Sequence, residues 1–279
     1  GTITMGRLQA NLSPVEGGKV IRKALDRGVT FFDTAQTYGS YSHLREGLKG
    51  WTDKFVVASK SLKASYKDMK NAVEEALKEM NLKRIAIFHL HLIKSKEDFL
   101  RREGALECLL DLREKGVIQA VGTSAHAAEG VKAVLDCDEI DIVFPLINKK
   151  GFGIVDGTLE NMLQAVRSAK AKGKHLYAMK SLGGGHLIED IPAAIDYVRK
   201  LSLFDSISVG MKTQEEVEVN VRIFENKSVP IHLMEKVKSV GKRLIVYDSC
   251  NKCSTCEDTC DQGAIKVGEK KAVVDHSKC

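Results

Sequence analysis

The sequence has no run close to the roughly 20 consecutive apolar residues that span a bilayer. It opens without the charged and apolar stretches of a secretory signal. Its net charge of +6 is spread over mixed Lys/Glu segments such as Lys67–Lys83, and no basic block is interleaved with aromatic residues. We therefore expect a soluble cytoplasmic protein that binds neither membranes nor nucleic acid.

Cysteine is almost absent from most of the chain. Only Cys108 and Cys137 precede residue 250, in contexts typical of buried helix residues, whereas five more fall within the last 30 residues. The chain of 279 residues is long enough for one large core before this change in composition. We predict a main domain over residues 1–232, a linker over 233–247 and a separate segment over 248–279.

Short β-branched runs alternate with longer stretches of helical period, as in βα units around a parallel sheet. Met69, Val73, Leu77 and Met80, for example, form the apolar stripe of an amphipathic helix. Eight units can be counted in this way. The predicted strands are Thr2–Met5, Val29–Thr34, Phe55–Ser59, Ile85–Leu90, Ile118–Thr123, Ile140–Leu146, His175–Lys180 and Ser206–Val209.

Glycine ends several of the predicted helices. Gly28, Gly116 and Gly173 each follow a basic residue and precede a strand, which suits a helix C-terminus. No Gly-x-Gly-x-x-Gly follows the first strand, which argues against a doubly wound dinucleotide fold. The sequence therefore predicts an α/β protein with a closed (β/α)8 TIM barrel. Because Gly1–Met5 already has the pattern of a strand, we expect the natural chain to begin further upstream.

Four polar side chains follow consecutive strands of this predicted barrel. Asp33 ends the second strand, Tyr38 lies in the loop after it, Lys60 closes the third strand and His91 closes the fourth. Catalytic groups of a βα barrel sit where strands end, because that face presents several side chains to one pocket. We therefore predict that these four side chains lie together.

Their chemistry suits the reduction of a carbonyl. Tyr38 is the natural acid, and a nearby ammonium such as Lys60 would lower the phenol pKa from its usual value near 10. Asp33 would hold Lys60 charged, and His91 could orient the substrate oxygen. Taken one at a time, these residues have simpler interpretations. Asp33 could be a helix cap and Tyr38 a packed aromatic, while Lys60 could be a solvated strand end and His91 a core histidine. One of His89 and His91 must be such a core histidine.

The residues around these four resemble a known family. Phe31–Ala35 followed by Tyr38 and Gly39 is similar to the aldo-keto reductase signature, as are Gly116–Ser124 and the stretch from Gly210 through Asn220. The resemblance covers most of the chain. It implies that Asp33, Tyr38, Lys60 and His91 are the catalytic tetrad.

Loops after the seventh and eighth strands are suited to a dinucleotide phosphate. Ser181-Leu182-Gly183-Gly184-Gly185 permits close approach of the backbone to a pyrophosphate, although it could also be only a flexible loop. After the eighth strand, Lys212 could meet a 2′-phosphate beside a helix N-terminus, which favours NADP(H) over NAD.

The resemblance adds further cofactor contacts. It implies that Gly210, Lys212, Glu216 and Asn220 contact the adenosine phosphates and that Ser124 contacts the nicotinamide carboxamide. The chain departs from the family at Ala125, where many members have Asn, and at Phe144, where many have Gln. These departures put recognition of the carboxamide in doubt. The predicted cofactor-binding residues are Ser124, Ser181, Leu182, Gly183, Gly184, Gly210, Lys212, Glu216 and Asn220.

The C-terminal cysteines have the spacing of bacterial ferredoxins that hold [4Fe-4S] clusters. The run Cys250-x2-Cys253-x2-Cys256-x3-Cys260 leads through two short strand patterns to Cys279, with Asp261 in place of the usual Pro. Zinc is the alternative, although structural zinc ligands normally come in two separated pairs. The segment resembles the ferredoxin-like domain of an iron–sulfur subgroup of aldo-keto reductases, with two [4Fe-4S] clusters.

The cysteine set is incomplete for two clusters. In bacterial ferredoxins the fourth cysteine of a run ligates the other cluster, so Cys250, Cys253 and Cys256 would hold one cluster and Cys260 with Cys279 the other. We therefore interpret the chain as cut at both ends and expect the segment after Asp248 to be poorly ordered or metal-free.

Two functional hypotheses follow. The first is an NADP(H)-dependent oxidoreductase that interconverts small carbonyl and alcohol substrates, coupled through its iron–sulfur segment to a redox protein partner. The second is an electron-transfer or structural adaptor with a non-catalytic barrel, for which Ala125 and Phe144 leave room. Stoichiometric binding of NADPH distinguishes the two.

Overall fold

The computed structural model describes residues 1–239, 246–260 and 263–275. The chain divides into two compact units, Gly1–Lys238 and Ser239–Cys279, each of which is described by itself. Within the described ranges, no helix is long and apolar enough to cross a membrane.

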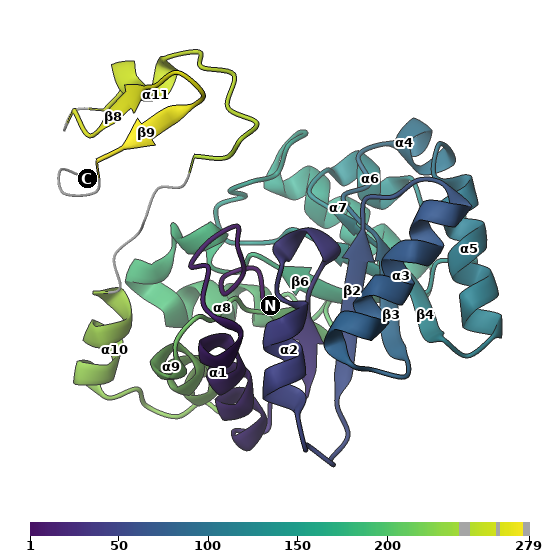
Figure 1. The fold of residues 1–279 in the computed structure, drawn as a ribbon, viewed down its shortest axis with the longest axis horizontal. Coiled ribbons are helices and arrows are strands. Elements are labelled where there is room, and N and C mark those ends of the chain that lie inside the picture. The colour runs from purple at the N-terminus through teal and green to yellow at the C-terminus, as the bar shows by residue number, and fades with distance from the viewer. Residues whose placement is uncertain (240–245, 261–262, 276–279) are drawn as a thin grey trace. The chain divides into compact units, whose positions relative to one another are not determined.

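The first unit is built on a parallel sheet with seven strands in its described part, in the order β1-β2-β3-β4-β5-β6-β7. The sheet curves into a nearly closed barrel, and the helices lie outside it (Figure 1). The register pairs Asp33 with Ala58 and Lys60 with His89 across neighbouring strands. The strands are β1 (Phe31–Asp33), β2 (Val56–Ser61), β3 (Ile85–Leu90), β4 (Ile118–Ala125), β5 (Ile142–Pro145), β6 (His175–Met179) and β7 (Ser206–Ser208).

Alternate residues of each strand face either the barrel interior or the helices. A cluster inside the barrel contains Ala58, Phe144, Leu146, Tyr177 and Met179. The larger core joins the outer faces of the strands to the helices. The helices are α1 (Pro14–Asp26), α2 (Tyr41–Leu48), α3 (Tyr66–Met80), α4 (Lys96–Leu100), α5 (Glu103–Glu114), α6 (Ala128–Lys132), α7 (Leu159–Ala171), α8 (Ile191–Lys200), α9 (Gln214–Phe224) and α10 (Ile231–Lys238), with 3-10 turns η1 (Gln36–Tyr38), η2 (Gly183–Gly185) and η3 (Ile188–Asp190).

The prediction of a first strand over Thr2–Met5 is wrong. These residues form turns, in which the Met5 N–H donates to the Thr2 carbonyl. Among the described residues, two backbone bonds join Gly1–Met5 to the strand ends: Gly1 N donates to Val209 O and Thr2 N donates to Asp33 O. Two bonds are too few for a ladder, so the chain bridges the gap between β7 and β1 without adding an eighth strand.

Each of the other seven predicted strands overlaps an observed one. The start of the predicted linker, by contrast, is helical in the structure. Helix α10 packs Leu233, Met234 and Val237 against apolar residues of α8 and α9. Residues 240–245, inside the predicted linker, lie outside the described residues.

The second unit contains a short helix, α11 (Thr255–Asp258), and an antiparallel hairpin of β8 (Ile265–Val267) and β9 (Ala272–Val274). Ala264, Ile265 and Ala272 are its buried side chains among the described residues. The two strand patterns predicted after the cysteine run therefore correspond to a real hairpin. Asp261 and Cys279 lie outside the described residues.

Candidate active site

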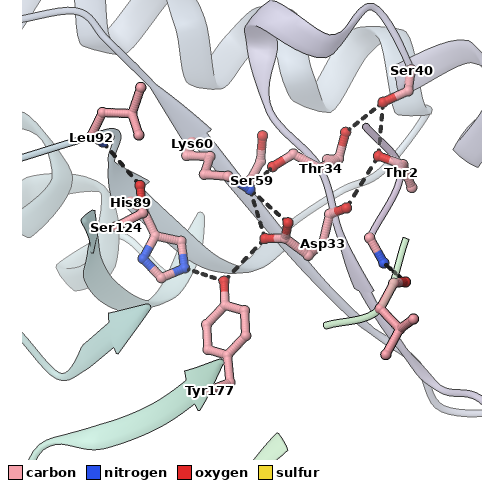
Figure 2. Close-up of polar contacts among 12 residues, drawn as sticks. Thr2, Asp33, Thr34, Ser40, Ser59, Lys60, His89, Leu92, Ser124 and Tyr177 are labelled. Carbon is pink, nitrogen blue, oxygen red and sulfur yellow. Dashed lines mark hydrogen bonds and ion pairs between the residues drawn. The ribbon is translucent and has the colours of Figure 1, made fainter. Parts of the chain in front are cut away.

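An ion pair between Asp33 and Lys60 lies inside the barrel, at the ends of β1 and β2 (Figure 2). The Lys60 ammonium donates to both carboxylate oxygens, at 2.8 and 2.7 Å, and to the Thr34 carbonyl at 2.6 Å. The side chains are 1% and 6% exposed. All three ammonium protons are therefore used, so Asp33 fixes both the charge and the position of Lys60.

Two aromatic rings flank the Lys60 ammonium. Its nitrogen lies 4.9 Å from the ring centroid of Tyr38 and 5.2 Å from that of Phe144. Burial lowers the pKa of Lys60, whereas the charge of Asp33 raises it. The contact with Tyr38 is made through the ring face, where a cation is attracted by the π electrons.

Tyr38 ends the 3-10 turn η1 and is followed by Gly39, which has a left-handed φ of 65°. The Tyr38 carbonyl accepts the N–H of Arg7 at 3.1 Å, and a Cβ on Gly6 would lie only 2.0 Å from that carbonyl oxygen. Burial and the nearby charge of Asp33 raise the pKa of Tyr38 well above its ordinary value. The expectation that Lys60 lowers this pKa is therefore wrong, because burial outweighs the effect of the ammonium and the charge of Asp33 acts in the same direction as burial. Tyr38 therefore stays protonated at neutral pH.

His91 follows β3, and its ring lies edge-on to Tyr38 with 6.0 Å between the ring centroids. Its backbone is fixed on both sides: His91 N donates to Ser61 O at 3.0 Å, and Arg102 donates to His91 O at 2.8 Å. Burial, followed by the charge of Lys60, lowers the pKa of His91 to about 2. The imidazole is neutral at physiological pH, and its Nδ1 has no hydrogen-bond partner in the described part of the chain.

Tyr177 and His89 also belong to this cluster, although neither was predicted from the sequence as a catalytic residue. The Tyr177 hydroxyl on β6 donates to Asp33 Oδ2 at 3.1 Å and lies 2.7 Å from His89 Nε2 (Figure 2). His89 is the core histidine of the pair His89/His91. A tyrosine inside a predicted strand has no sequence signal that separates such a contact from packing.

The predicted cofactor residues after β6 lie in a tight turn. Gly183 and Gly184 have φ of +57° and +68°, so side chains there would be strained. Leu182 packs beside α8 and α9. Ser181 is 1% exposed, and its Oγ has no partner among residues 1–239, 246–260 and 263–275. Ser124 lies on β4, where its Oγ accepts the Leu92 N–H at 3.0 Å.

The predicted cofactor residues after β7 surround the start of α9. The Glu216 carboxylate accepts the N–H groups of Lys212 at 2.5 Å and Thr213 at 3.3 Å, which completes a capping box. Asn220 donates to Glu216 O at 2.7 Å, whereas its buried Oδ1 has no partner in the described ranges. Gly210 packs against the side chain of Thr4.

The cysteines predicted as metal ligands lie around α11. Cys253 is exposed, while Cys250, Cys256 and Cys260 are partly buried. The Cys260 sulfur accepts the Ala264 N–H at 3.3 Å. Among the described residues, no three His, Cys, Asp or Glu side chains are gathered as a metal would require.

Comparison with known proteins identifies the family. The sequence profile of the Aldo/keto reductase family matches residues 1–203. L-galactose dehydrogenase of Arabidopsis thaliana is 24% identical over 266 residues, which cover 79% of this chain and 82% of that protein. An aldo-keto reductase of Gibberella moniliformis is 27% identical over 198 residues, which cover 65% of this chain and 57% of that protein.

Solved structures share the fold. An aldo-keto reductase structure from Pseudomonas aeruginosa has a TM-score of 0.66 at 22% identity, covering 80% of this chain and 86% of that chain. The holo form of an aldo-keto reductase from Bacillus halodurans has a TM-score of 0.64 at 16% identity, covering 85% and 90%. The fold is therefore that of the (β/α)-barrel oxidoreductases. The chain belongs to the aldo/keto reductase family.

Proposed function

We propose that the barrel transfers hydride between NADP(H) and a small carbonyl or alcohol substrate, with Tyr38 as the proton donor in the reducing direction. The observation that carries this proposal is the buried Asp33–Lys60 pair with the rings of Tyr38 and His91 beside it. A bound reduced nicotinamide would supply the hydride. Because an alkoxide is far more basic than a phenolate, Tyr38 can protonate it even with a raised pKa.

The neighbouring groups prepare this proton transfer. Neutral His91 can donate a hydrogen bond to the substrate oxygen without adding a charge. The Lys60 ammonium is held against the ring face of Tyr38 and favours the phenolate that remains after the proton has left. Asp33 keeps that ammonium in place and limits how far its charge lowers the Tyr38 pKa.

The residues after β6 and β7 have features that support binding of the cofactor there. Two buried polar atoms, Ser181 Oγ and Asn220 Oδ1, are without partners in the described ranges, which is costly unless a ligand satisfies them. The turn at Gly183 and Gly184 permits a close approach of the backbone to phosphate. We propose that these residues and Lys212 hold the dinucleotide.

Replacing Lys212 by Ala is expected to weaken NADPH binding by about 1–3 kcal/mol, as for a lost charge-assisted hydrogen bond to the 2′-phosphate. Binding of NADH should barely change. Titration by fluorescence measures both, with Lys170→Ala as the control, because Lys170 pairs with Asp205 at the start of β7 rather than at its end. Equal losses for the two dinucleotides would show that Lys212 does not read the 2′-phosphate.

We further propose that the cysteine segment binds iron and sulfide and passes single electrons to and from a redox protein partner. Thiolate is the ligand that iron–sulfur clusters require, and the N–H of Ala264 that points at the Cys260 sulfur is of the kind that tunes cluster potentials. Residues 250–260 would hold the cluster by closing around it when it binds.

Anaerobic reconstitution of the 279-residue polypeptide is expected to load less iron than two cubane clusters contain. Cys253→Ser should lower the iron bound per chain. Cys137→Ser should leave the bound iron unchanged, because Cys137 lies in the barrel unit, where its thiol is hydrogen-bonded to Glu139. Iron counting and EPR of the reduced protein provide the readout. Two stable cubane clusters would contradict the assignment in which Cys260 crosses to the second cluster.

The alternative is an electron-transfer or structural adaptor with a non-catalytic barrel. It is favoured by Phe144, because a ring that stacks on Tyr177 stands where many family members have the amide side chain of Gln. An adaptor has no reason to bind NADPH, so stoichiometric binding would exclude it.

A further inference from the structure

We propose that Tyr177 is a positioning residue for the proposed reaction. His89, Tyr177, Asp33 and Lys60 form a hydrogen-bonded series, and through it Tyr177 sets how strongly the Asp33–Lys60 ion pair acts on Tyr38. This inference rests on the proposed function. Tyr177 lies on β6 and Asp33 on β1, 144 positions apart in the chain. The contact therefore crosses the barrel interior (Figure 2).

The number of available protons determines which group donates in each of these hydrogen bonds. Tyr177 has one phenolic proton and two neighbours, of which the Asp33 carboxylate can only accept. Because the one phenolic proton goes to Asp33, the 2.7 Å contact between His89 Nε2 and the phenol oxygen is a hydrogen bond only when Nε2 carries the ring proton and donates it. Burial and the charge of Lys60 lower the pKa of His89 well below its ordinary value, so the ring is neutral. Both contacts are satisfied only if His89 donates to Tyr177 and Tyr177 to Asp33.

Packing leaves Tyr177 little freedom to make other contacts. Its ring stacks on Phe144 with centroids 3.8 Å apart and planes at 16°, and tilts against Phe31 at 4.9 Å. His89 is held by Gly122, where a Cβ would lie 2.3 Å from the ring nitrogen Nδ1. Phe144, the departure from the family pattern, thus supports the tyrosine that contacts Asp33.

The consequence for Tyr38 has a definite sign. Tyr38 faces Asp33 of β1, Lys60 of β2 and His91 after β3, while Arg7 bonds to the neighbouring Thr37 carbonyl. His91 is neutral, so Asp33 and Lys60 are the charged groups of this set that act on Tyr38, in addition to burial, which is the largest cause of its raised pKa. The negative charge of Asp33 raises the pKa of Tyr38, and the hydrogen bond from Tyr177 disperses part of that charge. Loss of that bond should therefore raise the Tyr38 pKa further.

Tyr177→Phe keeps the ring and removes only the hydroxyl. In alcohol oxidation, where Tyr38 must act as the base, we expect the apparent pKa in the pH profile of kcat/KM to move up by about half a unit to one unit and the rate at neutral pH to fall about threefold to tenfold. The affinity for NADPH should stay the same. A merely structural role would change the melting temperature without moving this pKa.

Two variants of His89 test the same hydrogen bonds. His89→Leu removes the donor to Tyr177 and should shift the profile in the same direction by less, whereas His89→Gln can still donate and should restore it. In a Tyr177→Phe background, His89→Leu should not move the apparent pKa further, because the hydrogen bonds through the Tyr177 hydroxyl are already lost.

Unmoved profiles in Tyr177→Phe and His89→Leu would overturn the inference while leaving the proposed function intact, provided that Tyr38→Phe is inactive. If Tyr177→Phe does not fold, the two His89 variants decide by themselves. Full activity of Tyr38→Phe, or no turnover by the parent chain, would instead overturn the proposed function and this inference with it.

Discussion

Tyr38→Phe is expected to lower carbonyl reduction at least about a hundredfold, the scale of lost general acid catalysis, and to leave NADPH binding unchanged. The reason is that the developing alkoxide loses its proton donor, while the Lys60–Asp33 pair beneath the ring remains intact. Single-turnover reduction of an aldehyde under saturating NADPH measures the chemical step directly.

The matched control is Tyr66→Phe, which should retain full turnover. It removes a hydroxyl on α3 that donates a hydrogen bond to Asp111 on α5. Full turnover by the Tyr38 variant would show that another group supplies the proton. An equal loss in both variants would point to a general effect on the fold.

Lys60→Met should abolish measurable turnover and destabilise the barrel unit by about 3–5 kcal/mol, because it leaves the buried Asp33 carboxylate without its cation. The double variant Asp33→Asn/Lys60→Met removes both charges and should recover most of the stability without recovering turnover. Urea unfolding measures the free-energy difference, provided that the dependence on urea concentration is the same for all variants.

Lys132→Met provides the comparison at the surface. Lys132 pairs with Glu129 on α6, where the side chains are 42% and 60% exposed, so its loss should cost less than about 1 kcal/mol. If the double variant were no more stable than Lys60→Met alone, the cost would have to come from lost packing and not from an unpaired charge.

The strand pattern was predictable where β-branched residues alternate over a full strand. β2, β3 and β4 overlap their predicted ranges closely because each is paired on both sides and packs apolar residues on its outer face. Thr2–Met5 has a similar local pattern, but among the described residues its backbone bonds to a strand end only through Thr2 N and Asp33 O, and the preceding Gly1 N donates to Val209 O. Local sequence does not show whether a ladder of partners exists.

The candidate site was predictable only in part. Asp33, Lys60 and His91 lie at or just after strand ends and Tyr38 lies in the loop after β1, which sequence spacing reveals, and the structure brings the four together. The partners of Tyr177 depend on the register of strands that lie far apart in the sequence, so composition and periodicity carry no signal for them. The direction in which the Tyr38 pKa shifts depends on burial and on the nearby charge of Asp33, which are also three-dimensional properties.

The proposal of hydride chemistry is tested most directly by following the hydrogen itself. The full chain is incubated with a carbonyl substrate and NADPH deuterated at C4 of the nicotinamide, with each of the two C4 positions labelled in turn, and the alcohol is analysed by mass spectrometry. The account predicts that the label from one of the two positions is found on the carbinol carbon of the product. Consumption of NADPH without deuterium in the alcohol, or no consumption with any of a set of aldehydes, ketones and quinones, would contradict it.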